Sequence, residues 1–221
     1  MRAREFITEH QLDEAVVSPV IISTLRSKGY KLLGSGADQW AFLEPATGQV
    51  LKIFGAADTS RAMSRYSEAQ KMAITWIKYC QKNADNPFLP KFSGWSKFVL
   101  DRKIYLQIRM EKLGSSNVQW ESAISRMGRY TAGAHRLSEY LHIVFKRDPT
   151  IQNTPDMDAT LVMSLGKDGI QILWQTLRDL REIGKANGWD WDLHSGNVMT
   201  RNDGTPVIVD PWYLGEEGSN W

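Results

Sequence analysis

Three polar side chains in the last part of the sequence are of types that bind metal ions and move protons. Asn197 follows Asp192 by five residues, and Asp210 follows Asn197 by thirteen. Two short apolar runs joined by Asp203-Gly204 lie between the last two, which predicts a β-hairpin. Such a hairpin brings Asn197 and Asp210 to the same end of the ribbon. Carboxylate and carboxamide oxygens suit Mg²⁺, so the spacing predicts magnesium ligands at Asn197 and Asp210 and leaves Asp192 for a different task.

Each of these residues also has a purely structural explanation. Asp192 and Asn197 can be turn formers that hydrogen-bond to their own backbone, and Asp210 can simply precede Pro211 in a loop. The spacing of the three residues favours a shared site over three unrelated turns.

Residues farther upstream could complete a phosphate-binding site. The stretch "LLGSGADQWAF" contains Gly34 and Gly36, and "VLKIF" contains Lys52. Val50 and Lys52 share one face of this alternating strand, so a charge stands where apolar residues are expected and needs a partner. Glu68, in the helical pattern that follows, could supply that partner, although a solvated surface position is the commoner meaning of a single glutamate.

The elements that must position these residues can be predicted from periodicity and turn signals. A short helix, a three-stranded meander, a long helix and two further strands form an α+β first part, and the remainder is mainly helical until the hairpin. The expected ranges are a helix from Pro19 to Gly29, strands within 30–54, a helix over 58–83, strands within 91–113, helices within 120–147, a surface loop over 147–160, and a helix with Ile170, Leu173, Leu177 and Leu180 on one stripe.

The order and spacing of these motifs resemble those of protein kinases and kinase-like phosphotransferases. The "DLHSGN" wording is similar to the aminoglycoside, choline and fructosamine kinases, and "GTPVIVDPW" is similar to the last of these. The stretches "KLLGSG", "DLHSGNVM" and "IVDP" together more specifically resemble the early serine/threonine protein kinases of short-tailed bacteriophages. This resemblance covers residues 30–54 and 189–215.

The resemblance implies a minimal two-lobed kinase-like fold of the α+β class. Its parts are an N-terminal arm over 1–17, an N-lobe with an antiparallel sheet and one helix over 18–113, and a short, truncated, mainly helical C-lobe over 114–221. ATP then binds in the cleft with Mg²⁺, and its terminal phosphoryl group passes to serine or threonine hydroxyls of host proteins during infection.

The same resemblance assigns roles to individual residues. Asp192 orients the substrate hydroxyl and accepts its proton, Asn197 and Asp210 hold magnesium, and Lys52, paired with Glu68, contacts the phosphates. The ATP-binding residues that the resemblance implies are Gly34, Gly36, Ala41, Val50, Lys52, Glu111 and Leu113.

Departures from the kinase pattern keep other functions open. Gln39 replaces the third glycine of the loop, Asp190-Trp191 replaces the usual His-Arg pair, and Pro211-Trp212 follows the metal aspartate in place of Phe-Gly. The alternatives are a small-molecule phosphotransferase, a nucleotide-binding protein without turnover that grips a host protein, and a kinase-like enzyme that transfers AMP.

The charge composition argues against some classes of binding partner. Lys plus Arg number 27 against 25 Asp plus Glu, so no strong field marks a dedicated nucleic-acid or membrane-surface binder. Cys80 is the single cysteine, and no stretch predicts a signal peptide or a membrane span. We therefore expect a cytoplasmic protein, in the host cytoplasm if it is viral, that acts on proteins and not directly on nucleic acid or membranes.

Overall fold

The structure is a computed structural model that describes residues 17–35, 39–55, 60–100, 103–115, 118–131, 136–145, 162–193 and 196–215. Its fold is mixed α+β, with a five-stranded antiparallel sheet and several helices, as the sequence predicts. The chain divides into two compact units. The first contains the residues up to Gln81 together with Lys91–Lys112, and the second contains Lys82–Pro90 together with the residues from Leu113 onward.

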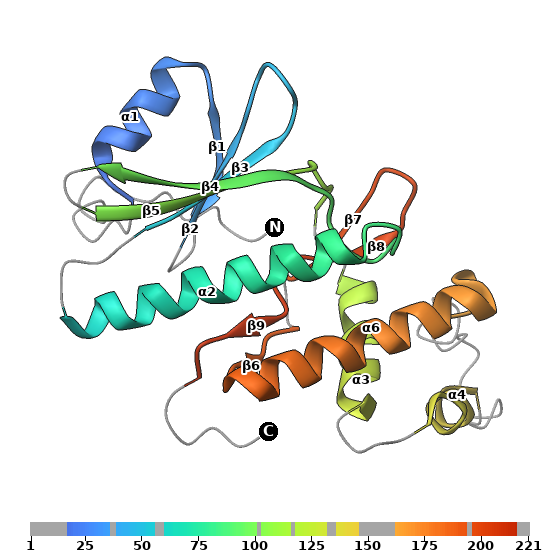
Figure 1. Cartoon of the computed structure of the whole chain (residues 1–221). Coiled ribbons are helices and arrows are strands. Elements are labelled where there is room, and N and C mark those ends of the chain that lie inside the picture. Colours follow the sequence, from blue (N-terminus) through green and yellow to red (C-terminus); the bar gives the residue numbers. More distant parts are fainter. Residues whose placement is uncertain are drawn as a thin grey trace. The chain divides into compact units, whose positions relative to one another are not determined.

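The sheet of the first unit has the strand order β1-β2-β3-β5-β4, with every neighbouring pair antiparallel (Figure 1). Its predicted meander and its predicted pair of later strands are both confirmed. The strands are β1 (Lys31–Ser35), β2 (Gln39–Leu43), β3 (Val50–Phe54), β4 (Phe92–Leu100) and β5 (Lys103–Met110), and the helices are α1 (Pro19–Ser27) and α2 (Ser60–Lys82).

Strand alternation gives this sheet two apolar faces, and each is covered by one helix. One face packs against α1, and the residues of this cluster include Ile21, Ile22, Trp40, Phe42, Leu51, Ile53 and Tyr105. The other face packs against α2, and the residues of that cluster are Phe54, Ala73, Ile77, Leu106 and Ile108. A position in β3 therefore faces α1 or α2 according to whether its number is odd or even.

The predicted first helix is confirmed, and Ser18 directly precedes it. The Ser18 side chain makes no capping hydrogen bond. Instead, the backbone amides of Ile21 and Ile22 donate to the Ser18 carbonyl at 2.9 and 3.2 Å, and proline occupies the start of the helix as expected. Gly29, with a φ of 82°, ends the segment in the left-handed conformation that glycine tolerates.

The second unit is built on helices α3 (Val118–Thr131), α4 (Leu137–Phe145) and α6 (Gly166–Asn187). Its strands are β6 (Asp190–Trp191), β7 (Val198–Thr200), β8 (Pro206–Ile208) and β9 (Trp212–Tyr213). The predicted stripe of α6 is confirmed, because Ile170, Leu173, Leu177 and Leu180 are all buried. The loop predicted over 147–160 lies outside the described residues.

Aromatic contacts join α3, α4 and α6. The Tyr140 ring of α4 lies 5.3 Å from the Tyr130 ring of α3 and 5.7 Å from the Trp174 ring of α6, measured between ring centroids. Gly188, with a φ of 71°, ends α6 and turns the chain toward β6. The end of α6 therefore determines where the polar stretch after Trp189 begins.

The predicted hairpin is confirmed as the pair β7 and β8, with Val198 opposite Ile208. The Thr205 amide donates to Asp203 Oδ1 at 2.9 Å in its turn, and this bond lowers the pKa of the Asp203 carboxyl. The sequence did not predict the second ladder, in which Asp190 and Trp191 of β6 pair with Tyr213 and Trp212 of β9.

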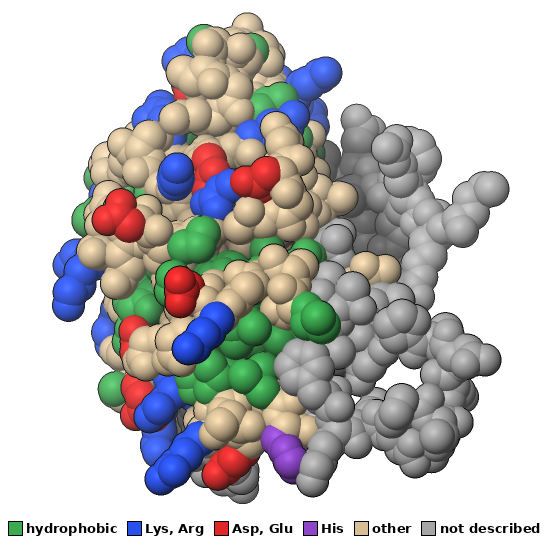
Figure 2. All heavy atoms as spheres, turned by 90° about the vertical axis from the view of Figure 1, so that its right-hand side faces the viewer, with side chains coloured by type: hydrophobic (Ala, Val, Ile, Leu, Met, Phe, Trp, Pro, Cys, Tyr) green, Lys and Arg blue, Asp and Glu red, His purple; other side chains and the backbone are tan. Residues whose placement is uncertain are grey.

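Charged side chains of both signs are interspersed on the face that Figure 2 shows, which agrees with the nearly balanced composition. Among the helices that the structure describes, none combines the length and the apolar character needed to cross a membrane.

Gly128 of α3 is required by a neighbouring ring. A Cβ atom added there would lie 2.9 Å from Trp191 Cζ2. We expect Gly128→Ala to lower the free energy of unfolding by about 1 kcal/mol, because overpacking outweighs the gain in helix propensity. Urea denaturation measures this change. Gly94→Ala is the control, since no described atom lies within 4 Å of its added Cβ, and equal stability of the two variants would contradict the prediction.

Candidate functional site

The Asn197 side chain binds directly to Asp192. Its amide nitrogen Nδ2 donates to the Asp192 carbonyl oxygen at 2.6 Å and to the carboxylate oxygen Oδ2 at 3.0 Å. One amide group thus fixes both the backbone and the side chain of Asp192. Because the nitrogen of the amide is turned toward Asp192, the carboxamide oxygen is turned the other way.

Two backbone hydrogen bonds bring Asp210 to the same place. The Val209 amide donates to the Asn197 carbonyl at 3.0 Å, and the Asp192 amide donates to the Pro211 carbonyl at 2.9 Å. Asp210 lies between Val209 and Pro211, so its two chain neighbours are bonded to Asn197 and to Asp192. The three residues predicted to form a site are therefore adjacent where the β7-β8 hairpin meets the β6-β9 ladder, all within the second unit.

The β7-β8 hairpin is held by the segment Lys82–Pro90. The Arg201 guanidinium donates to the Pro87 carbonyl and, at 2.8 Å, to the Leu89 carbonyl. On β8, the Ile208 amide donates to the Phe88 carbonyl at 2.9 Å. The turn is thus attached through Arg201 and β8 through Ile208, and Ile208 pairs with Val198, the residue directly after Asn197.

Tryptophan side chains support the other side of the polar stretch. The Trp189 and Trp212 rings are 5.3 Å apart, and Trp212 Nε1 donates to the Leu180 carbonyl of α6 at 2.8 Å. The Trp191 ring lies against Gly128 and beneath the Arg181 guanidinium, whose carbon is 6.0 Å from the ring centroid. Burial lowers the pKa of Arg181. The tryptophans therefore pack and hold the strand that leads to Asp192.

The donor set at this site fits a hard cation. Asn197 and Asp210 offer an amide oxygen and a carboxylate, the ligand types that Mg²⁺ prefers alongside phosphate oxygens. Within the described ranges, no three His, Cys, Asp or Glu side chains gather as metal ligands. The predicted magnesium site thus depends on one carboxylate, one amide and the phosphates of a nucleotide.

The residues predicted to bind ATP in the first unit form a row across the sheet. Ala41 of β2 pairs with Gly34 of β1 on one side and with Lys52 of β3 on the other, and Lys52 also pairs with Ile108 of β5. Val50, two residues before Lys52, shares its face and is 8% exposed. This is the face that α2 covers, because Ile108 belongs to the cluster that includes residues of α2.

Glu68 belongs to α2, the helix on the same face as Lys52. Its carboxylate oxygen Oε2 lies 3.5 Å from Lys71 Nζ on the same helix. The pairing of Lys52 with Glu68 stays a prediction.

The remaining predicted residues follow β5 or belong to the glycine-rich loop. The Glu111 amide donates to the Lys91 carbonyl at 2.9 Å, while Glu111 Oε1 accepts a hydrogen bond from the Lys91 amide at 2.8 Å. Leu113 is buried. Glu111 belongs to the first unit and Leu113 to the second. Gly36 lies outside the described residues.

No family model matches the chain, and no curated protein matches it. The resemblance to kinases therefore depends on the motifs and on the arrangement of the residues that carry them.

Sequence reasoning missed the residues that position the site. Arg201 and its acceptor Pro87 are 114 positions apart, and nothing in the sequence near either residue signals the other. The pairing of Trp191 with Trp212 had a weak signal, since Trp191 directly precedes Asp192 and Trp212 lies two residues after Asp210. Strands of two residues are too short to show alternation.

We expect Asn197→Asp to destabilise the chain at neutral pH. The substitution places a carboxylate oxygen against the two Asp192 oxygens that now accept hydrogen bonds, which lowers the free energy of unfolding by about 1–3 kcal/mol. Urea denaturation at pH 7 tests this. Asn202→Asp is the matched control, because Asn202 is exposed in the turn of the same hairpin. Equal losses in the two variants would show that the Asn197 amide does not hold Asp192.

Proposed function

We propose that this chain is an ATP- and Mg²⁺-dependent phosphotransferase with a minimal two-lobed kinase-like fold, and that it acts as a phage-type serine/threonine kinase on host proteins. The observation that carries the proposal is the direct bond from the Asn197 amide to Asp192, next to Asp210. A pair of turn-forming residues would need bonds only to their own backbone. Here the amide also holds the carboxylate that the reaction needs.

The proposed reaction uses Asp192 as the proton acceptor. The Asp192 carboxylate orients a serine or threonine hydroxyl and takes its proton as the hydroxyl oxygen attacks the γ-phosphorus of ATP. A new oxygen–phosphorus bond forms, the bond from the γ-phosphorus to the bridging oxygen breaks, and ADP leaves. The hydrogen bond from Asn197 to Oδ2 keeps the carboxylate in one orientation, which lowers the entropy lost on reaching the reactive geometry.

Asn197 and Asp210 are the residues proposed to hold magnesium. Bound there with the nucleotide, the ion neutralises charge on the phosphate oxygens. The bond from the Val209 amide to the Asn197 carbonyl matters for this role, because it keeps both ligands at one end of the ribbon.

In the first unit, Lys52 is proposed to contact the phosphates, with Glu68 as its partner. The row formed by Gly34, Ala41 and Lys52 supports this role, because all three side-chain positions share one sheet face. Gly34 has neither a positive φ nor a described atom within 4 Å of an added Cβ, so packing does not explain the glycine. A phosphate that must approach the backbone does explain it.

Asp192→Asn tests the proton acceptor. The substitution keeps the shape of the side chain and an oxygen that can accept the bond from Asn197, so we expect ATP binding to be retained and phosphoryl transfer to fall about 10²–10⁴-fold. Purified protein is incubated with Mg²⁺, γ-labelled ATP and bacterial lysate, and label is read on protein bands.

Asp203→Asn is the control for this experiment, because Asp203 is an exposed carboxylate on the same hairpin. Wild type and control should label the same bands. Full activity of Asp192→Asn would place the base elsewhere. Label on small molecules alone would favour the small-molecule phosphotransferase that the "DLHSGN" stretch suggests.

Asp210→Ala tests the metal site separately from the chemistry. We expect the variant to lose the gain in ATP affinity that Mg²⁺ provides, by about tenfold or more, because Asp210 is the only charged side chain proposed as a ligand of the ion. Calorimetric titration of ATP with and without Mg²⁺ measures this. An unchanged effect of Mg²⁺ on affinity would remove Asp210 from the metal site.

A further inference from the structure

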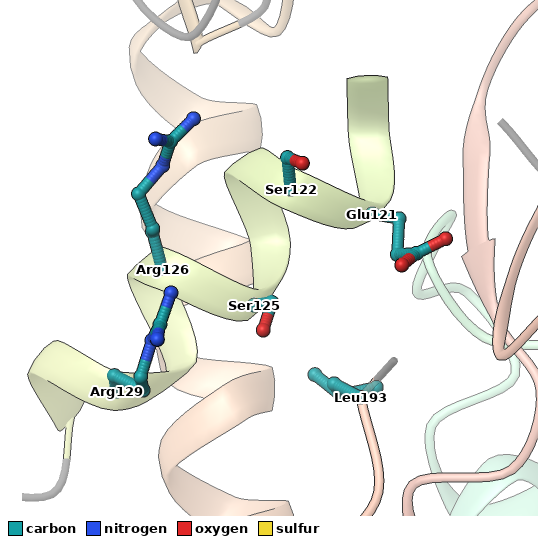
Figure 3. A pocket seen from close by; sticks show the side chains of 6 residues that line it. All are labelled: Glu121, Ser122, Ser125, Arg126, Arg129 and Leu193. Carbon is teal, nitrogen blue, oxygen red and sulfur yellow. The ribbon is translucent and has the colours of Figure 1, made fainter. Parts of the chain in front are cut away.

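A small pocket lies beside the loop that carries Asp192. It has a volume of about 190 Å³ and lies between α3 and Leu193, the residue directly after Asp192. Its lining residues are Glu121, Ser122, Ser125, Arg126, Arg129 and Leu193 (Figure 3). Both the helix and the loop belong to the second unit.

The polar lining comes from one face of α3. Ser122, Ser125, Arg126 and Arg129 are three or four positions apart, which places them side by side on the helix surface. The opposite face is apolar and buried through Ala123, Ile124 and Met127. Core packing therefore fixes which face of the helix carries the two arginines and two serines.

The charges of the pocket favour an anionic group. The lining contains two arginines and one glutamate, so positive charge is in excess. Guanidinium groups bind carboxylate and phosphate oxygens with directed hydrogen bonds. The serine hydroxyls add donors. Figure 3 shows Glu121 and Arg129 near opposite ends of the lining, with Ser125 between them and Leu193 on the neighbouring segment.

One acceptor atom of the lining lacks a hydrogen-bond donor among the described residues. Glu121 Oε2 is buried and accepts no hydrogen bond from the part of the chain that the structure describes. A buried carboxylate oxygen without a donor is costly, so this atom suits a ligand that brings an N–H or O–H group. An anion for the arginines and a donor for Glu121 are both available in a polypeptide, from an acidic side chain and from a backbone amide.

The size of the pocket limits what it holds. A volume of about 190 Å³ is below the range of about 300–1,000 Å³ for pockets that enclose a whole ligand. It suits one charged side chain of a larger molecule. Since Ser122, Arg126 and Arg129 are exposed, a chain lying across α3 can reach them.

We infer that this pocket is an anion subsite that recognises an acidic residue close to the phosphorylated serine or threonine of a peptide substrate. The role of the peptide as phosphoryl acceptor rests on the proposed function, whereas binding of an anion in this pocket does not. The adjacency of Leu193 to Asp192 places the anionic side chain within a few residues of the acceptor hydroxyl.

Binding of labelled peptides tests the inference without turnover. Four peptides share one acceptor serine and differ at a single neighbouring position. That position is glutamate, glutamine, lysine or phosphoserine. Fluorescence anisotropy should show that wild type prefers the glutamate or the phosphoserine peptide over the glutamine peptide. A preference for one of these two identifies carboxylate or phosphate as the natural anion.

The double variant Arg126→Glu/Arg129→Glu should lose this preference, with affinity for the preferred peptide falling about tenfold or more. Arg178→Glu, an exposed arginine on α6, is the control and should behave as wild type. Ser122→Asp places one negative charge in the lining and should weaken binding in the same direction. Unfolding temperatures confirm that each variant is folded.

A preference that survives the double reversal, or no preference in wild type, would overturn the subsite. Adding Mg²⁺ and ATP to the same peptides separates the two proposals. Anion-dependent binding without transfer leaves the subsite standing and removes the kinase function. If the phosphoryl group is transferred equally well to the glutamate peptide and to the glutamine peptide, the kinase function stands and the subsite is removed.

Discussion

The polar stretch between α6 and the β7-β8 hairpin depends on one side-chain amide. Asn197 donates through a single nitrogen to the carbonyl and the carboxylate of Asp192, and its own carbonyl accepts from Val209. A chain that turns between two short strands loses many backbone partners, and those partners must be replaced for the turn to stay folded. The amide replaces them locally, and it does so with a group that also orients a charged oxygen.

Packing of the tryptophan side chains fixes the position of the strand that leads to Asp192, and thereby the position of the oxygens to which the Asn197 amide donates. The Trp189 and Trp212 rings and the bond from Trp212 to Leu180 hold β6 and β9 on α6. Gly128 admits Trp191 to the surface of α3. The same helix carries Ser125 and Arg129, so one helix both supports the loop and lines the pocket beside it. Support for the polar residues and recognition of an anion thus share one rigid element.

Much of the fold could be predicted from the sequence, because its long elements have strong periodicity. The α6 stripe, the α2 helix, the meander and the β7-β8 hairpin each contain enough repeats or a defined turn pair. The grouping of Asp192, Asn197 and Asp210 could be predicted from hairpin geometry. The bonds that secure it could not. Arg201 reaches Leu89 across 112 positions, and β6 pairs with β9 over two residues, so neither leaves a local pattern.

The two compact units are not continuous segments of the chain, so they cannot be expressed separately by dividing the sequence at one point. Lys82–Pro90 belongs to the second unit, although the chain on either side of it belongs to the first. The chain therefore crosses between the units three times, and no single cut separates them. A fragment that begins at Leu113 would lack the carbonyls of Pro87, Phe88 and Leu89 that hold the hairpin. The two units are interleaved in the sequence, so the second is complete only when it includes Lys82–Pro90 as well as the residues from Leu113 onward.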